Sequence, residues 1–131
     1  MKVLVVSADP SVRHTMALAA RSAGRTGGGE RFEVLESADG LRGIQLAWRH
    51  RPDVVVADEI ASRAGAFALT KDLKGADPPF PGGIVILLER ESDAWLADWA
   101  KADAWFVKPV DPFALAETLR GLVTTVEEEA G

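Results

Sequence analysis

The sequence predicts a single α/β domain built on a five-stranded parallel sheet. Five short runs of Val, Ile, Leu and aromatic residues are spread along the chain, and segments with the apolar spacing of amphipathic helices separate them. Buried strands that alternate with helices indicate a doubly wound sheet with helices on both faces. The length of 131 residues suits one domain of ordinary size.

The predicted strands are continuous apolar runs, as expected of strands that are buried on both faces. In chain order they are Val3 to Val6, Phe32 to Leu35, Val54 to Ala57, Ile84 to Leu88 and Trp105 to Val107. Glycine and proline clusters punctuate the chain between these elements. One of them, Gly27 to Gly29, follows a helix and precedes a strand, which is the reverse of a phosphate-binding loop, so we expect a plain connector.

Residues that cap helices mark where four of the five helices begin. They are Asp9 or Ser11 for the first helix, Asp39 for the second, Ser92 or Asp93 for the fourth, and Asp111 with Pro112 for the fifth. The third helix, around Leu69 and Leu73, lacks such a signal because the preceding residues are small and offer no decisive cap. The pattern therefore predicts five helices, one after each strand.

Composition narrows the class of protein. There is no cysteine, which excludes thiol catalysis, zinc sites built on cysteine and disulfides. The net charge of -5 argues against direct binding of nucleic acid, which needs clustered Lys and Arg. No apolar stretch is long enough for a membrane span, and the N-terminus lacks signal-peptide features. We expect a cytoplasmic protein.

Two charged residues close predicted strands. Asp58 ends the run RPDVVVAD, and Lys108, followed by Pro109, ends ADAWFVKP. In a doubly wound sheet, ligands bind where the strands end and the loops toward the helices begin. The sequence therefore predicts that a carboxylate and an ammonium group meet at one edge of the sheet.

Three segments of the chain, which follow one another in the family's order, resemble the receiver domain of two-component response regulators. PDVVVAD is similar to the family's third strand, FEVLESADG to its second strand and turn, and ADAWFVKPVDP to its fifth strand with a Lys-Pro pair. The resemblance covers about residues 1–123, with 124–131 as the end of the last helix and a tail. It implies a flavodoxin-like fold with strand order 2-1-3-4-5 and five helices.

The resemblance also implies roles for particular residues. Asp58 stands at the place of the phosphoacceptor and Lys108 at the place of the family's active-site lysine. Trp105 stands where the family has its switch aromatic residue. A histidine kinase or a phosphotransfer protein would be the donor, and Mg²⁺ the cofactor.

The metal site departs from the family pattern. The first strand is followed by Ser7, Ala8 and Asp9, so that Ala8 replaces the usual metal-ligating acid. The fourth strand closes with Leu88 and then Glu89, where the family has Ser or Thr. Because Ala8 removes one of the two acids that usually ligate Mg²⁺ in this family, the site left by Asp9 and Asp58 would hold magnesium weakly or not at all.

Two other interpretations of these acids stay open. In the first, Asp9 and Glu89 join Asp58 and rebuild a metal pocket from three carboxylates. In the second, Asp58 and Lys108 form a plain salt bridge that stabilises the fold, since ion-pair networks also place charges at strand ends.

We therefore expect a single-domain response regulator and not an enzyme. In one hypothesis Asp58 accepts a phosphoryl group in a phosphorelay despite a degenerate metal site. In the alternative, the chain is a pseudo-receiver that acts through protein–protein interaction or oligomerisation. Either way, output would pass through a separate partner, because no DNA-binding or catalytic domain follows in this sequence.

Three of the four tryptophans fall in one region, Trp95 and Trp99 in the fourth helix and Trp105 in the fifth strand. In receivers, the face made by the fourth helix, fifth strand and fifth helix binds partners, and tryptophan is enriched at binding hot spots. This face would bind an effector protein or a second copy of the chain. The alternative is that these side chains simply cover the sheet.

Overall fold

A computed structural model describes residues 1–26, 32–61 and 63–130, so Gly27 to Gly29 lie outside the described residues. In chain order the elements are β1 (Lys2–Val6), α1 (Pro10–Thr26), β2 (Glu33–Ser37), α2 (Gly40–His50), β3 (Val54–Asp58), α3 (Ala66–Lys74), β4 (Gly83–Leu88), the 3-10 turn η1 (Glu91–Asp93), α4 (Ala94–Trp99), β5 (Ala104–Val107) and α5 (Pro112–Ala130). Each predicted strand overlaps an observed one.

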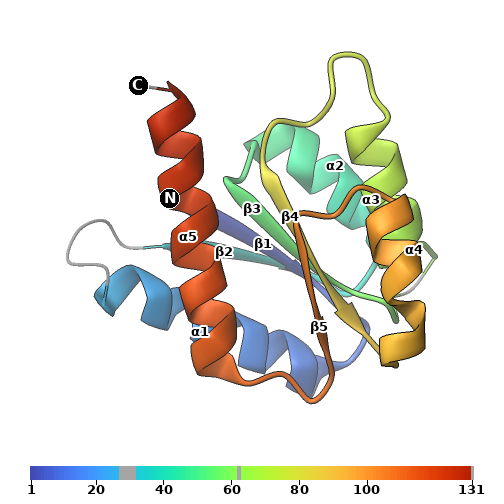
Figure 1. Cartoon of the computed structure of the whole chain (residues 1–131), viewed down its shortest axis with the longest axis horizontal. Helices are drawn as coiled ribbons and strands as arrows, with labels where there is room; N and C mark the ends of the chain where they lie inside the picture. Colours follow the sequence, from blue (N-terminus) through green and yellow to red (C-terminus); the bar gives the residue numbers. More distant parts are fainter. Residues whose placement is uncertain (27–31, 62, 131) are drawn as a thin grey trace.

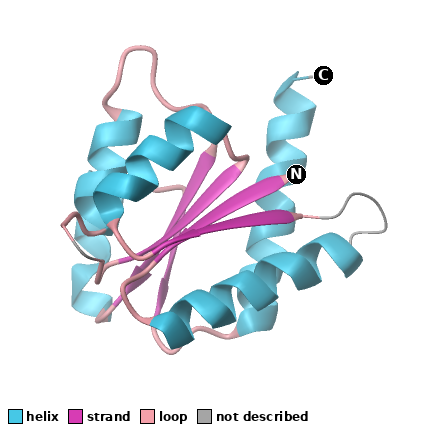
Figure 2. Ribbon diagram, turned by 180° about the vertical axis from the view of Figure 1, so that it is seen from behind, coloured by secondary structure: helices cyan, strands magenta, loops and turns pink. Residues whose placement is uncertain are grey.

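The strands form one parallel sheet in the order β2-β1-β3-β4-β5. Figure 1 shows α1 and α5 side by side against one face of this sheet, while α2, α3 and α4 cover the other. The view from behind in Figure 2 shows the strands sandwiched between the two helical layers. The predicted fold class and strand order are confirmed.

Alternate residues of the buried strands supply two separate cores, as the strand period of two requires. Val54 and Val56 of β3 pack with Met16 of α1 and Leu115 of α5. The intervening Val55 and Ala57 belong to the cluster that α2, α3 and α4 cover. The side of the sheet on which a residue lies therefore follows from its place in this alternation.

Capping explains most of the helix starts. The Asp39 side chain accepts hydrogen bonds from the backbone N–H groups of Leu41 and Arg42 at the start of α2. No side chain caps α3, in agreement with the weak signal there. The predicted side-chain cap on α4 is wrong, because Asp93 belongs to a 3-10 turn and has a helical backbone instead of the extended one that a cap needs.

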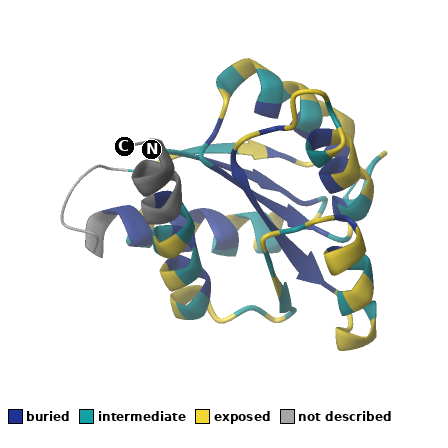
Figure 3. Ribbon diagram, turned by 45° about the horizontal axis from the view of Figure 1, so that its top comes forward, coloured by how far each residue is buried: buried dark blue, intermediate teal, exposed yellow. Residues whose placement is uncertain are grey.

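Burial is concentrated in the sheet. Figure 3 shows β3 and β4 as buried almost throughout, whereas exposed residues lie on the outer sides of the helices and in the loops. Within the described residues, no helix has the length and apolar character that a membrane crossing requires.

Candidate functional site at the carboxyl edge of the sheet

Asp58 is the last residue of the central strand β3, and its side chain is fully buried. β1 and β4 flank β3, so Asp58 lies beside the point where the strand order reverses between β1 and β3. In open α/β sheets, ligands bind at such a switch point. The fold thus places the Asp58 carboxylate within reach of residues that follow the neighbouring strands β1 and β4.

Three hydrogen-bond donors surround the Asp58 carboxylate. Lys108 Nζ donates to Oδ1 at 2.7 Å, and the Ile60 backbone N–H donates to the same oxygen at 3.2 Å. Ser7 Oγ donates to Oδ2 at 2.6 Å. The predicted meeting of Asp58 and Lys108 is therefore present, and the carboxylate has a partner on each oxygen.

Lys108 is shared between two acids. Its ammonium group forms an ion pair with Glu89 as well as with Asp58, and its side chain is only 18% exposed. Burial by itself would lower the pKa of Lys108, but the hydrogen bonds to Asp58 and then to Glu89 outweigh burial, and the pKa lies above its ordinary value. Lys108 is charged at neutral pH and is paired with both carboxylates.

Ser7 is a site residue whose role the sequence did not reveal. Besides its bond to Asp58, its hydroxyl oxygen accepts from the Asp9 backbone N–H at 3.1 Å, and its own backbone N–H donates to the Ser37 carbonyl at 3.0 Å. The sequence did contain a chemical clue to this role. A serine hydroxyl can donate a hydrogen bond to the Asp58 carboxylate, whereas an ionised acid at the same position would repel it.

Leu88, which the resemblance placed at the family's Ser or Thr position, does not lie on the face of the sheet that carries Asp58. Leu88 packs in the core cluster on the α2, α3 and α4 side, whereas Leu87, which pairs with Asp58 in the β3–β4 register, packs on the opposite side. Since strand residues alternate between faces, Glu89 follows Leu87 on the face of Asp58. The family's hydroxyl position thus corresponds to Glu89, whose carboxylate pairs with Lys108.

Asp9 serves as the cap of α1. Its Oδ1 accepts hydrogen bonds from the Ser11 hydroxyl at 2.7 Å and the Ser11 backbone N–H at 2.9 Å, and these two bonds lower its pKa. Among the described residues no three acids or histidines are grouped so that they could hold a metal ion. The described residues therefore do not bring Asp9 and Glu89 together with Asp58 as a group of three acids.

Comparison with known proteins identifies the family. No protein-family model matches the chain. An uncharacterized response regulatory protein of Mycobacterium tuberculosis, found in two strains, is 34% identical over 89 residues, which are 68% of this chain and 66% of that protein. The chemotaxis response regulator CheY4 of Vibrio cholerae superposes with a TM-score of 0.77 at 26% identity, over 92% of this chain and 97% of that one. The chain is a response regulator receiver domain.

A further solved structure shares the receiver fold. It is the receiver domain of a sensor histidine kinase from Pseudomonas aeruginosa, which matches with a TM-score of 0.78 and 19% identity over 94% of this chain and 97% of that one. That structure is described with a magnesium ion coordinated in its active-site cleft. In this receiver domain, the side chain of Ala8, after β1, has no oxygen that could ligate a metal ion.

A second acidic contact links the loops that follow β3 and β4 of the receiver domain. Glu59 Oε2 accepts a hydrogen bond from the Glu89 backbone N–H at 2.7 Å. Burial is the main cause of the raised pKa of Glu59, and the nearby carboxylates of Asp93 and Glu89 add to it against the opposing effect of that hydrogen bond. The folded domain therefore disfavours the ionised form of the Glu59 carboxyl group.

The tryptophans of the receiver domain lie at its surface. Trp95 is 64% exposed and Trp99 54%, so the interpretation that these two side chains cover the sheet is wrong. Trp105 on β5 is 36% exposed. Phe113, at the start of α5, is 80% exposed and went unnoticed in the sequence because a single Phe next to a helix start gives no periodic signal. Exposed aromatic residues therefore occur on α4, β5 and α5.

Proposed function

We propose that this receiver domain acts in two-component signalling mainly as a protein-interaction module, with Asp58 locked in an ion-paired network. The observation that carries the proposal is the closed set of donors around Asp58, in which Ser7 and Lys108 each hold one oxygen of a fully buried carboxylate. This corresponds to the pseudo-receiver alternative.

The chemistry of phosphoryl transfer supports this preference. Transfer to a carboxylate brings two anions together, so it depends on cations that neutralise the shared charge. Lys108 is the cation that contacts Asp58, and Glu89 already takes part of its charge. The residues at the end of β1 do not fit a magnesium ion, because Ser7 donates to Asp58 and Ala8 offers only a methyl group.

The exposed aromatic face supports the interaction role. Trp95 and Trp99 on α4 and Trp105 on β5 present apolar area that is unusual for exposed positions. Tryptophan is also among the residues that contribute most to binding energy when an interface covers them. The partner would be an effector protein or a second copy of the chain.

A second candidate function is that Asp58 accepts a phosphoryl group, and the 2.7 Å contact with Lys108 favours it. A histidine kinase or phosphotransfer protein would present a phosphohistidine. The P–N bond would break, a P–O bond to Asp58 would form, and the electron pair of the broken bond would return to the histidine ring. Ser7 would first have to release Oδ2 or turn to donate to the phosphoryl group.

Incubation with phosphoramidate in the presence of magnesium, followed by intact mass measurement, separates the two functions. We expect no phosphoryl adduct on the parent protein under conditions that fully modify an active receiver run in parallel. An adduct on the parent that is missing from Asp58→Asn would overturn the locked-aspartate proposal and establish the second candidate. Asp53→Asn, directly before the other end of β3, is the matched control for loss of one charge.

A further inference from the structure

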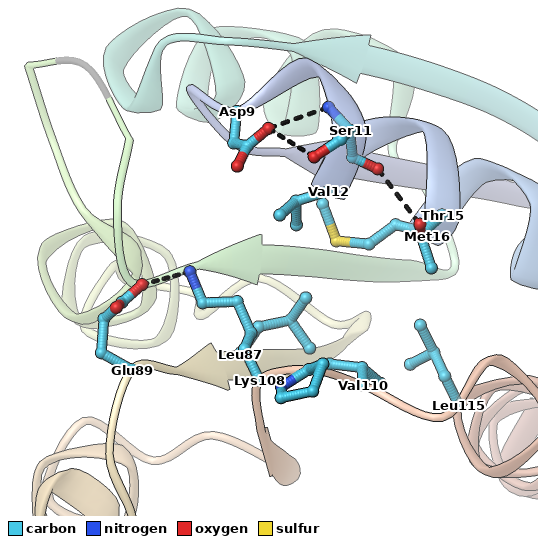
Figure 4. A pocket seen from close by; sticks show the side chains of 11 residues that line it. Asp9, Ser11, Val12, Thr15, Met16, Leu87, Glu89, Lys108, Val110 and Leu115 are labelled. Atoms are coloured by element: carbon cyan, nitrogen blue, oxygen red, sulfur yellow. Dashed lines mark hydrogen bonds and ion pairs between the residues drawn. The ribbon is translucent and has the colours of Figure 1, made fainter.

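A cavity of about 480 Å³ lies next to the ion pair, between the start of α1, the end of β4 and the connection from β5 to α5. Figure 4 shows side chains from these three parts of the chain around it. Pockets that bind small molecules usually have volumes of about 300–1,000 Å³. The size of this cavity therefore suits a small organic ligand, and none of the functions considered above makes use of it.

The floor of the cavity is apolar and fixed. It is lined by Met16, Leu87 and Leu115, each no more than 1% exposed and each a member of the core cluster beneath α1 and α5. Because these side chains are held by the packed core, the cavity is preformed. An apolar group placed there would gain the hydrophobic contact that such a floor offers.

The rim of the cavity is polar and carries more acid than base. Asp9, Glu89 and Lys108 line it, which gives a formal charge of -1 from two acids and one lysine. Lys108 is already engaged by Asp58 and Glu89, so it has little to offer an incoming anion. Both hydrogen bonds that Ser11 donates to the Asp9 side chain go to Oδ1, and the carboxylate lies at the exposed edge of the cavity.

We propose that this cavity binds a small amphipathic cation, with an apolar body on the floor and an ammonium group held between Asp9 and Glu89. Charge complementarity selects this class of ligand, because the rim carries two carboxylates and its lysine is already paired with Asp58 and Glu89. The site is distinct from a phosphoryl site, which would need cations where this rim offers carboxylates.

The proposed site is connected to Asp58 through one side chain. A ligand ammonium group beside Glu89 would compete with Lys108 for the same carboxylate. Lys108 would then interact with Asp58 alone. Binding of a ligand in the cavity would therefore change the ion pairing of Lys108. This residue directly follows β5, the strand that carries Trp105.

The two methionines allow a direct binding test. We would label the full chain with ¹³C at the methionine methyl groups and add 4-phenylbutylamine, with 4-phenylbutanol and 4-phenylbutyrate as neutral and anionic analogues. The Met16 methyl signal should shift in a saturable way with the amine, whereas that of Met1, which precedes β1 and does not line the cavity, should stay in place. If none of the three compounds shifts Met16, the cavity is no ligand site.

Two variants test the geometry. Asp9→Asn keeps a residue that caps helices well but removes the rim charge, and it should weaken amine binding about tenfold. Asp39→Asn, at the cap of α2 on the other side of the sheet, is the matched control and should bind like the parent. Val110→Phe should fill the cavity and abolish the shift. Equal affinity for the butyrate, or unchanged binding in Asp9→Asn, would overturn the cationic ligand.

Discussion

Ser7 Oγ donates a 2.6 Å hydrogen bond to Asp58 Oδ2, and neither residue is exposed to solvent. The bond joins the ends of β1 and β3, the two strands between which the sheet order reverses. Lys108, after β5, holds the other oxygen of the same carboxylate. One buried acid thus connects three segments that are far apart in the sequence. Loss of one of its hydrogen bonds should therefore lower the free energy of unfolding of the whole domain.

Removal of the Ser7 hydroxyl should destabilise the fold. In Ser7→Ala the buried Asp58 carboxylate loses a donor that nothing else in its surroundings replaces, and hydrogen bonds to charged groups contribute about 1.5–3 kcal/mol. We expect the free energy of unfolding to fall by about 2 kcal/mol, measured by urea denaturation.

Ser11→Ala is the control for that change. Ser11 also donates its hydroxyl to an aspartate, Asp9, but this pair is exposed. Water can replace the lost donor there, so the loss of stability should be about 0.5 kcal/mol or less. An equal fall in the free energy of unfolding in both variants would mean that burial does not strengthen the stabilising effect of the Ser7–Asp58 hydrogen bond.

Lys108 and Asp58 should show strong energetic coupling. Lys108→Met leaves Asp58 ionised and buried without its cation, which should cost about 3–5 kcal/mol. Adding Asp58→Asn removes that uncompensated charge, so the double variant should lose less stability than the sum of the single variants. A double-mutant cycle by urea denaturation gives the coupling energy, and additivity would show that the two groups do not interact.

The Lys108 ion pairs should make the domain sensitive to alkaline pH. The pKa of Lys108 is raised above the ordinary value of 10.5. Below 10.5 both the folded and the unfolded chain carry the ammonium group, and the stabilisation is complete. As the pH rises through the folded pKa the stabilisation is lost. The difference in unfolding free energy between the parent and Lys108→Met should therefore shrink above about pH 10.5.

Glu59 should also make stability fall as the pH rises, but in the acid range. Its folded pKa is raised above the ordinary value of 4.5, mainly by burial. Below 4.5 the group is neutral in both states, and as the pH rises through the folded pKa it must ionise in a place that disfavours the charge. Stability should fall across this range in the parent. In Glu59→Gln, which keeps an acceptor for the Glu89 N–H, that part of the fall should be absent from urea denaturation curves.

Much of the fold could be predicted from the sequence because it depends on local patterns. The run Val54 to Ala57 is apolar at every position, and such runs between helical segments leave few arrangements other than a parallel sheet. The start of α4 was harder, because a 3-10 turn before it shifts the role of Asp93 from cap to turn residue. That difference depends on backbone angles that no composition rule reports.

The site was less predictable, because it depends on which face each side chain occupies. Asp58 and Lys108 end strands, so their meeting followed from the topology alone. Leu88 was misplaced because a shift of one residue along a strand moves a side chain to the opposite face. Ser7 was read as a lost acid, and its gain of a bond to Asp58 became evident only from the geometry.

Restoring acids at the end of β1 should create a metal site. In the double variant Ser7→Asp, Ala8→Asp, the donor on Asp58 Oδ2 is replaced by a carboxylate, and a further carboxylate appears one residue later. Three acids beside one another repel, and a divalent cation that binds oxygen ligands relieves the repulsion. Isothermal titration calorimetry should show magnesium binding at least about tenfold tighter than in the parent.

The same substitutions in an Asp58→Asn background separate a true site from surface charge. There the added acids remain but the central ligand is gone, so most of the gain in magnesium affinity should disappear. Equal affinities of the parent and the double variant would contradict the view that Ser7 and Ala8 are what deprive this receiver domain of its metal. A gain that survives Asp58→Asn would mean that the new acids bind the ion without help from Asp58, and that the carboxylate which Ser7 and Lys108 hold today is no part of the site.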